Sequence, residues 1–154
     1  RFLVKTATTS TLAAIKAAGQ RRSWTQAVKF LSDLKDSGLK PSLVIYNAVI
    51  NACGLGHQAQ CALSLLSEIK SQYAPDIVTY NSTIACLTKA HSWTEALNLF
   101  SDVKWKLLPV DVITYSTALS ACEVGHHWPG ALTLLQDARA EGLLLNVIAY
   151  SAAI

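Results

Sequence analysis

Hydrophobic and polar positions alternate along this chain with a helical period. Between residues 77 and 103, apolar residues stand three or four apart in two stripes, one from Ile77 to Leu87 and one from Trp93 to Val103. Residues at that spacing share one face of a helix. The stripes therefore predict two amphipathic helices, separated by a short polar break at 88–92.

The same pattern returns about every 35 residues. Tyr46, Tyr80, Tyr115 and Tyr150 align at intervals of 34, 35 and 35 residues. A period of this length is typical of stacked two-helix units that share one continuous core. The spacing predicts an all-α solenoid with a lead-in at 1–7, a divergent first repeat at 8–42, repeats at 43–76, 77–111 and 112–146, and the start of a fifth at 147–154. The shorter link of the 34-residue unit predicts a tighter turn into the next helix.

The boundaries of the predicted helices carry capping residues. Two capping boxes, Ser23 with Gln26 and Ser92 with Glu95, mark the start of a second helix. The residues that stand before the first helix of a unit are all types that accept hydrogen bonds from free helix amides. They are Ser42, Asp76, Asp111 and Asn146.

Composition excludes several classes of protein. With 51% hydrophobic and 15% charged residues, the chain supplies enough apolar surface for a packed core, and no apolar run approaches the ~18 residues that cross a bilayer. Residues 1–42 have eight basic and two acidic side chains, whereas residues 43–154 have five and eight. A polyanion would be steered to the N-terminal end. The chain opens on Arg1 and contains no methionine, so we expect a fragment of a longer protein. Its basic, Ser/Thr-rich start also resembles a transit segment, but the repeat pattern covers most of it.

Residues that could perform chemistry recur instead of forming one asymmetric site. His57, His91 and His126 share one repeat position, which favours the same local role in every turn over catalysis. The tryptophans at positions 24, 93 and 128 share another position and are expected to pack. The four cysteines lack metal-ligand spacing and are expected to be small buried residues in a reducing compartment. No enzyme motif is present, so we predict a non-catalytic module with no cofactor, metal or small-molecule substrate.

Three sequence features together resemble the pentatricopeptide repeat family. They are the Tyr-Asn or Tyr-Ser start of the first helix, the EALNLF type of second helix in TEALNLFSDVK, and the GLKPS link in DSGLKPS. The resemblance covers nearly the whole chain and implies a right-handed α-α superhelix. The tetratricopeptide repeat also pairs helices but expects a different tryptophan, glycine and tyrosine pattern.

The resemblance implies that the chain binds single-stranded RNA and that each repeat reads one base. In the family, the residue after the tyrosine and the last residue of the repeat contact the base edge, and Asn with Asp goes with uracil while Ser with Asn goes with adenine. Carried across, this implies a 5′-UUA-3′ core and a role in organelle RNA processing, stability or editing, in a chloroplast or mitochondrion. The implied pairs are Asn47 with Asp76, Asn81 with Asp111, and Ser116 with Asn146.

Further positions follow from the same resemblance. Lys89 stands where family members can contact phosphate, and Leu12 occupies the base-reading position of the first repeat, so that layer should specify nothing. The branched residues two positions before each tyrosine would hold the bases between adjacent repeats. They are Val44, Val78, Ile113 and Ile148.

Two alternatives stay open from the residues alone. Asp76 and Asp111 would be chosen as helix caps even if no RNA bound, and a capping role can coexist with base reading. A protein-binding helical scaffold, whose concave face holds a peptide, is the second interpretation. Other proteins thus remain possible partners beside RNA.

Overall fold

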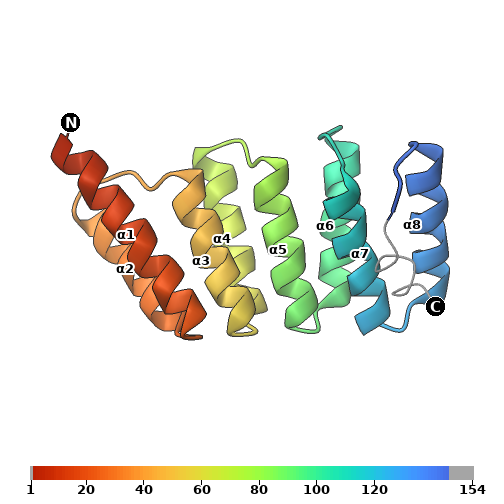
Figure 1. Ribbon diagram of the computed structural model, residues 1–154, viewed down its shortest axis with the longest axis horizontal. Helices are drawn as coiled ribbons and strands as arrows, with labels where there is room; N and C mark the ends of the chain where they lie inside the picture. Colours follow the sequence, from red (N-terminus) through yellow and green to blue (C-terminus); the bar gives the residue numbers. More distant parts are fainter. Residues whose placement is uncertain (1, 146–154) are drawn as a thin grey trace.

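The computed structural model describes residues 2–145, with side chains from residue 5 onward, and this part is entirely helical apart from turns and links. The helices follow one another as antiparallel pairs from one end of the molecule to the other (Figure 1). We call the first helix of each pair the A helix and the second the B helix. The A helices are α1 (Phe2–Gln20), α3 (Leu43–Leu55), α5 (Ile77–Lys89) and α7 (Val112–Val124), and the B helices are α2 (Trp24–Asp36), α4 (Ala59–Gln72), α6 (Trp93–Trp105) and α8 (Trp128–Ala140).

The pairs stack in two layers. Each A helix packs against the A helix of the next repeat, against its own B helix and against the preceding B helix, whereas the B helices make no extensive contact with one another in the described part. The aligned tyrosines Tyr46, Tyr80 and Tyr115 are fully buried between the layers. The all-α solenoid predicted from the period is confirmed. None of the described helices is long and apolar enough to cross a membrane.

The helices begin where the period places them. α3, α5 and α7 start directly after positions 42, 76 and 111, the last residues of predicted repeats. α1 runs from Phe2 through position 8 without a break, so residues 2–7 continue the first A helix. The link before α5 has four residues, whereas the links before α3 and α7 have six. The tighter turn predicted for the 34-residue unit is confirmed, but the repeat boundaries themselves stay predictions.

The predicted caps are only partly correct. Asp76 and Asp111 each accept a hydrogen bond from the backbone N–H three residues on, but the Ser42 side chain makes no cap bond. Both predicted capping boxes are wrong: Ser23 and Ser92 make no side-chain cap bond and have ψ angles of 69° and 58°, whereas the capping residues Asp76 and Asp111 have extended ψ angles of 175° and −178°. The Glu95 carboxylate accepts from the neighbouring Thr94 hydroxyl instead.

The repeated histidines lie in the turn between the A and B helices. His57, His91 and His126 all have positive φ, between 50° and 61°. In each turn the next residue's N–H reaches back five residues and the histidine N–H reaches back three, which is the Schellman pattern that closes a helix C-terminus. The Nδ1 of His57 also donates to the Lys89 carbonyl oxygen of the following repeat, at 2.6 Å. A shared local role in every turn is confirmed.

The predicted packing tryptophans contact the turn of the next repeat. A Cβ atom added to Gly56 would lie 2.3 Å from Cδ1 of Trp24, and one added to Gly125 would lie 2.3 Å from Cδ2 of Trp93. Glycine is therefore required at both positions, because the tryptophan ring lies too close to leave room for a side chain. Trp128 has no following turn to cover it among the described residues, and its side chain is 53% exposed.

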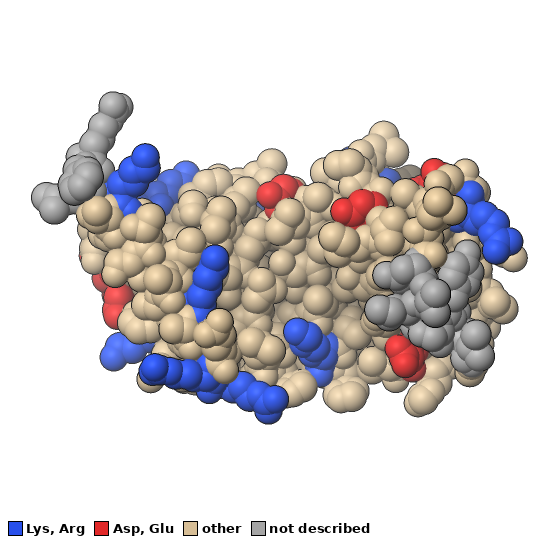
Figure 2. Space-filling view, in the orientation of Figure 1, with Lys and Arg blue, Asp and Glu red and all other residues tan. Residues whose placement is uncertain are grey.

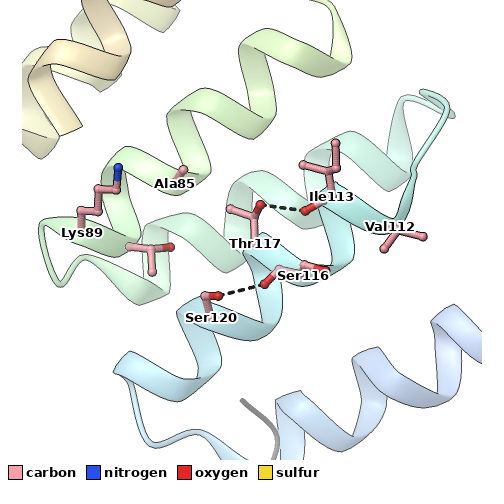
Figure 3. Close-up of a pocket in the computed structure, with 8 residues that line it drawn as sticks. Ala85, Lys89, Val112, Ile113, Ser116, Thr117 and Ser120 are labelled. Atoms are coloured by element: carbon pink, nitrogen blue, oxygen red, sulfur yellow. Dashed lines mark hydrogen bonds between the residues drawn. The ribbon is translucent and has the colours of Figure 1, made fainter. Parts of the chain in front are cut away.

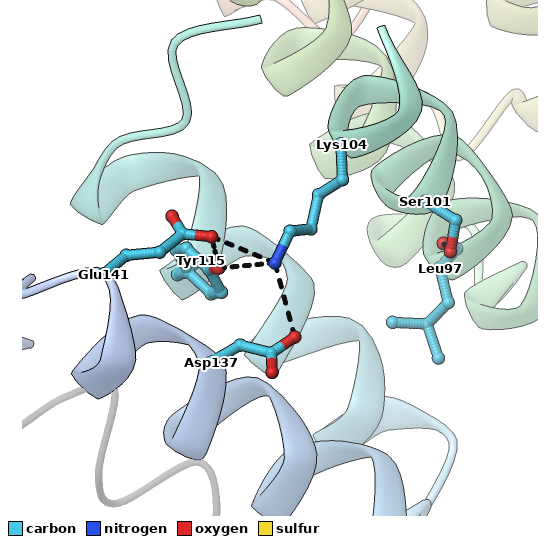
Figure 4. Close-up of polar contacts among 6 residues, drawn as sticks. All are labelled: Leu97, Ser101, Lys104, Tyr115, Asp137 and Glu141. Carbon is cyan, nitrogen blue, oxygen red and sulfur yellow. Dashed lines mark hydrogen bonds and ion pairs between the residues drawn. The ribbon is translucent and has the colours of Figure 1, made fainter. Parts of the chain in front are cut away.

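Charged side chains join adjacent repeats at the outer edge of the tyrosines. Lys104 pairs with Asp137 and Glu141 at 3.3 and 3.0 Å and donates to the Tyr115 hydroxyl at 3.0 Å (Figure 4). In the same way, Lys35 of repeat 1 pairs with Glu68 of repeat 2, and the Glu68 carboxylate accepts a hydrogen bond from the Tyr46 hydroxyl at 2.7 Å. These contacts connect three helices of two repeats and fix their register.

Candidate nucleic-acid interface

The predicted base-sandwiching residues form an exposed row at the start of successive A helices. Val44, Val78 and Ile113 are each the second residue of their helix, and their side chains are 58%, 54% and 63% exposed. Solvated branched apolar side chains gain little by themselves. Because one recurs in each of the second, third and fourth repeats, the row presents apolar surface at regular intervals. Ile148 lies outside the described residues.

The predicted base-reading residues lie one helical turn further along the same helices. Asn81 and Ser116 are partly exposed, whereas Asn47 is largely covered by its neighbours, at 9% exposed. The side-chain oxygens of Asn47 and Asn81 are buried and accept no hydrogen bond from the described residues. An unpartnered buried polar group costs about 1–3 kcal/mol. The two asparagine layers therefore each hold one acceptor that a donor group could satisfy.

The serine layer differs from the asparagine layers. The Ser116 carbonyl oxygen accepts from the Ser120 hydroxyl at 3.0 Å, and the Ser116 side chain is shorter than the asparagine amides. Beside it, the Thr117 hydroxyl donates to the Ile113 carbonyl at 2.7 Å. Since a hydroxyl donates and accepts while an amide oxygen only accepts, the two kinds of layer offer different groups to a ligand.

The second members of the first two predicted pairs, Asp76 and Asp111, cap the helices that follow them. Oδ1 of Asp76 accepts from the Thr79 N–H and hydroxyl, at 2.8 and 2.7 Å, and Oδ1 of Asp111 accepts in the same way from Thr114, at 2.9 and 2.8 Å. All these bonds use one oxygen of each carboxylate. Oδ2 of both aspartates has no hydrogen bond to the described residues, so capping leaves one acceptor free in each layer. Asn146 lies outside the described residues.

A pocket of about 440 Å³ opens between α5 and α7 on this face (Figure 3). Ile113 and Ser116 line it from α7, and Lys89 lines it from the end of α5. The structure thus brings three of the predicted residues, one of each kind, to a single hollow. Ser120 and Thr117, which sequence reasoning did not select, add hydroxyl groups to its wall. Each stands four residues after a predicted site residue, Ser120 after Ser116 and Thr117 after Ile113, and so shares a helix face with it, which was the available sequence signal.

Charge is unevenly distributed over this face. Figure 2 shows Lys and Arg side chains gathered toward the end formed by α1 and α2 and along the lower edge, where the A helices end. Acidic side chains lie along the upper edge, over the starts of α5 and α7, and a few others lie at the left edge and at the lower right. Asp76 and Asp111 begin these helices, and the exposed Lys89 ends α5. This charge distribution suits a ligand with a negatively charged backbone and neutral polar groups, if the backbone lies along the ends of the A helices, away from Asp76 and Asp111.

Comparison with known proteins agrees with the repeat architecture. A PPR repeat family model matches residues 75–124, and a pentatricopeptide repeat domain model matches residues 9–56 and 29–90. A search of curated proteins found no match.

Solved structures with the same fold belong to this class of protein. The crystal structure of the pentatricopeptide repeat protein PPR10 from maize superposes with a TM-score of 0.79 at 20% identity, over 93% of this chain and 21% of that one. PPR10 in complex with an 18-nt psaJ RNA element gives 0.85 at 22% identity, over 95% and 22%. The PPR domain of Arabidopsis thaliana protein-only RNase P 1, in complex with tRNA, gives 0.76 at 11% identity, over 90% and 74%. The chain spans about a fifth of the PPR10 chain that it matches.

Proposed function

Because the chain belongs to the pentatricopeptide repeat family, we propose that it binds single-stranded RNA in a sequence-specific manner, with a 5′-UUA-3′ core. The observation that carries this proposal is the pairing, in each of the two asparagine layers, of an exposed branched side chain with an unsatisfied acceptor one turn away. Val44 with Asn47 and Val78 with Asn81 form two such pairs. If no ligand bound here, the fold would be more stable with these two amides hydrogen-bonded or replaced by apolar groups.

Each layer can hold one splayed base. The branched side chains of adjacent A helices would contact the two faces of the base, and the asparagine amide would meet its Watson-Crick edge. Uracil presents an N–H donor at that edge, which suits the free oxygens of Asn47 and Asn81. In the third layer Ser116, with Asn146, would meet adenine. The free Oδ2 of Asp76 and of Asp111 adds an acceptor at the rim of the first two layers.

The phosphate backbone would follow the ends of the A helices. Lys89 is the cation in the pocket between α5 and α7, and residues 43–154 are acidic overall. Since phosphate contacts supply much of nucleic-acid affinity, three reading layers bind weakly. We therefore infer that this array is a non-catalytic part of a longer organellar protein that acts in RNA processing, stability or editing.

Fluorescence anisotropy with end-labelled single-stranded RNAs tests base reading. A UUA-containing RNA should bind more tightly than a scrambled RNA of the same composition, and more tightly than the UUU version. The double substitution Ser116→Asn with Asn146→Asp should reverse the preference between UUA and UUU. Equal binding of all the RNAs, by both proteins, would favour a peptide-binding scaffold instead.

A matched pair of variants separates base contacts from phosphate contacts. Asn81→Ala should weaken binding only to RNAs with uracil at the second position of the core, by about 1–3 kcal/mol. Lys89→Met should weaken binding to all of the RNAs alike and lower the salt dependence by about one phosphate contact. If Asn81→Ala weakened the binding of all the RNAs equally, the assignment of this layer to uracil would be wrong.

A further inference from the structure

Two cysteines of the second repeat are in direct contact, which the prediction of four inert buried thiols did not foresee. The Cys53 thiol, at the end of α3, donates to the Cys61 sulfur, near the start of α4, at 3.2 Å. Cys53 is fully buried, whereas Cys61 is partly exposed to solvent. No cluster of three metal-ligating side chains occurs between residues 5 and 145. The expectation of a buried residue is wrong for Cys61, which is partly exposed.

The contact makes the two thiols chemically unequal. The hydrogen bond from Cys53 lowers the pKa of the Cys61 thiol to about 7, although burial works against it. The same bond, together with burial, raises the pKa of Cys53. Burial raises the pKa of the Cys86 and Cys122 thiols to about 11. At neutral pH, Cys61 is therefore the thiol with a substantial thiolate fraction, and the thiolate is the nucleophile.

We propose that Cys61 is a modification site for hydrogen peroxide and that Cys53 is its resolving thiol. The Cys61 sulfur attacks one peroxide oxygen and the O–O bond breaks, which gives a sulfenic acid and hydroxide. The Cys53 sulfur then attacks the Cys61 sulfur, its proton passes to the departing hydroxyl, and water leaves as the S–S bond forms. Two thiols lose two electrons and the peroxide gains them. The two sulfur atoms need to approach by only about 1 Å to reach bonding distance.

The third cysteine in this region is held differently. Cys86, in α5, donates to the Gln58 carbonyl oxygen at 3.8 Å and is buried. Its thiol thus points to the turn of the second repeat and not to Cys61. Cys53 is the residue in position to resolve an oxidised Cys61.

The fourth repeat provides an internal control. Cys122 occupies the repeat position of Cys53, and Gly130 occupies the repeat position of Cys61. A Cβ atom added to Gly130 would lie 3.3 Å from the Cys122 sulfur, so the two positions are adjacent as in the second repeat, although the His127 ring lies closer still, at 2.3 Å. The fourth repeat has the buried thiol but lacks the exposed partner. Cys122 should therefore stay reduced where Cys53 is oxidised.

Peroxide treatment of the folded protein, followed by trypsin digestion and mass spectrometry, tests the proposal. The expected cleavage sites place Cys53 and Cys61 together in peptide 36–70, Cys86 in peptide 71–89 and Cys122 in peptide 107–139. Peptide 36–70 should lose two hydrogens, a decrease of about 2 Da, while the other two peptides keep alkylatable thiols. A peptide 36–70 that stays reduced, a cross-link to Cys86, or oxidation of Cys122 at the same rate would overturn the proposal.

Variants then assign the two roles. Cys53→Ser should leave Cys61 as a sulfenic acid that dimedone captures, Cys61→Ser should leave Cys53 reduced, and Cys122→Ser should change nothing. Cys53→Ala serves as a second test of the resolving role, and circular dichroism melts verify that each variant is folded. Alkylation of Cys61 in the unsubstituted protein should reach half its maximal rate near pH 7. A half-maximal rate near pH 9, as for an ordinary thiol, would contradict the assigned reactivity.

Discussion

The contacts between consecutive repeats, which we call seams, are of two kinds. At the first seam (repeats 1 and 2) and the third seam (repeats 3 and 4), a tryptophan covers a glycine in the next turn, and a lysine forms ion pairs with acids of the next repeat. The second seam (repeats 2 and 3) has Ala59 and Ala90 at the tryptophan and glycine positions. Bulk on one side of a seam is thus matched by space on the other.

The outer edge of the second seam is also built differently. The Lys70 ammonium lies over the Tyr80 ring, 5.8 Å from its centre, much as Lys35 and Lys104 lie over theirs, but it forms no ion pair with the described residues. The Tyr80 hydroxyl accepts from Lys106 of its own repeat at 2.7 Å. The short link before α5 has no residue with positive φ, and its Tyr73 hydroxyl donates to the Pro41 carbonyl at 2.5 Å. The residues on the two sides of each seam therefore fit one another, so replacing a residue on one side alone with its equivalent from another seam should destabilise the contact.

The largest expected effect comes from filling a covered glycine. Gly125→Ala places a methyl group 2.3–2.6 Å from three ring atoms of Trp93 and should lower the free energy of unfolding by about 1–3 kcal/mol. Trp93→Ala in the same protein should recover part of that loss, because it removes the obstacle. Urea denaturation of both single variants and the double variant measures the coupling. Additive losses would show that the two residues are not matched.

A transplant into the second seam should give a somewhat smaller effect. Ala59→Trp places an indole against Ala90 and should cost about 1–2 kcal/mol through overpacking. Ala59→Trp combined with Ala90→Gly reproduces the first and third seams and should be more stable than Ala59→Trp alone. Thermal melts report the difference, at about 2–4 °C per kcal/mol for a chain of this length. Equal melting of the two variants would sink the idea of matched seams.

The link before α7 contains a strained residue that the other six-residue link avoids. Leu107 has φ 54° and an almost fully exposed side chain, whereas Gly38 and Gly142 occupy the same position in repeats 1 and 4. Leu107→Gly should raise the free energy of unfolding by up to about 1 kcal/mol, because it relieves a left-handed conformation without loss of packing. Gly38→Leu is the reverse control and should lower it in urea melts. A stability loss in Leu107→Gly would show that the side chain contributes packing.

The smallest expected effect is a dependence on acid at the first and third seams. Burial tends to raise the pKa of Glu68, but hydrogen bonds from Lys35 and Tyr46 outweigh burial and hold this pKa below its usual range. A hydrogen bond from Lys104 likewise lowers the pKa of Glu141. A lowered folded-state pKa stabilises above the unfolded pKa of about 4.3 and is lost as the pH falls through the folded value. Each pair should contribute about 0.2–1 kcal/mol at pH 7, since the groups are partly solvated.

Lysine variants isolate that acid dependence. Lys35→Met and Lys104→Met should each reduce the difference between the free energies of unfolding at pH 7 and pH 3. Lys70→Met is the matched control at the second seam, where the lysine faces a ring instead of a carboxylate, and should leave the difference unchanged. A reduction of equal size in Lys70→Met would mean that net charge, and not the ion pairs, sets the acid dependence.

Sequence periodicity predicted the helices well because stacking imposes it. The positions of Tyr46, Tyr80 and Tyr115 predicted a buried row, and the helix starts at 43, 77 and 112 follow from the same count. The capping boxes at Ser23 and Ser92 were wrong because both residues follow a left-handed turn residue and lack the extended ψ angle of the capping residues Asp76 and Asp111. That turn geometry is not visible in the spacing of S-x-x-E or S-x-x-Q.

The positions of the candidate interface came from the family resemblance, and their burial could not be predicted. Val44, Val78 and Ile113 are exposed, as contact with bases would require, but that contact stays a prediction. That Asn47 is nearly covered depends on packing of neighbouring side chains, which periodicity does not report. The matched pairs Trp24 with Gly56 and Trp93 with Gly125 were visible in principle, since Ala90 replaces glycine where Ala59 replaces tryptophan. Reading them required comparison of one repeat with the next.

The asymmetry between the two layers gives the array its elastic character. The A helices form a continuous packed line, whereas the B helices make no extensive contact with one another in the described part and are joined directly by the lysine ion pairs of the first and third seams. Pulling or bending should therefore separate the B helices more readily than the A helices. The lysine ion pairs that link B helices oppose this separation weakly, so higher ionic strength should make the array easier to bend without disrupting its core.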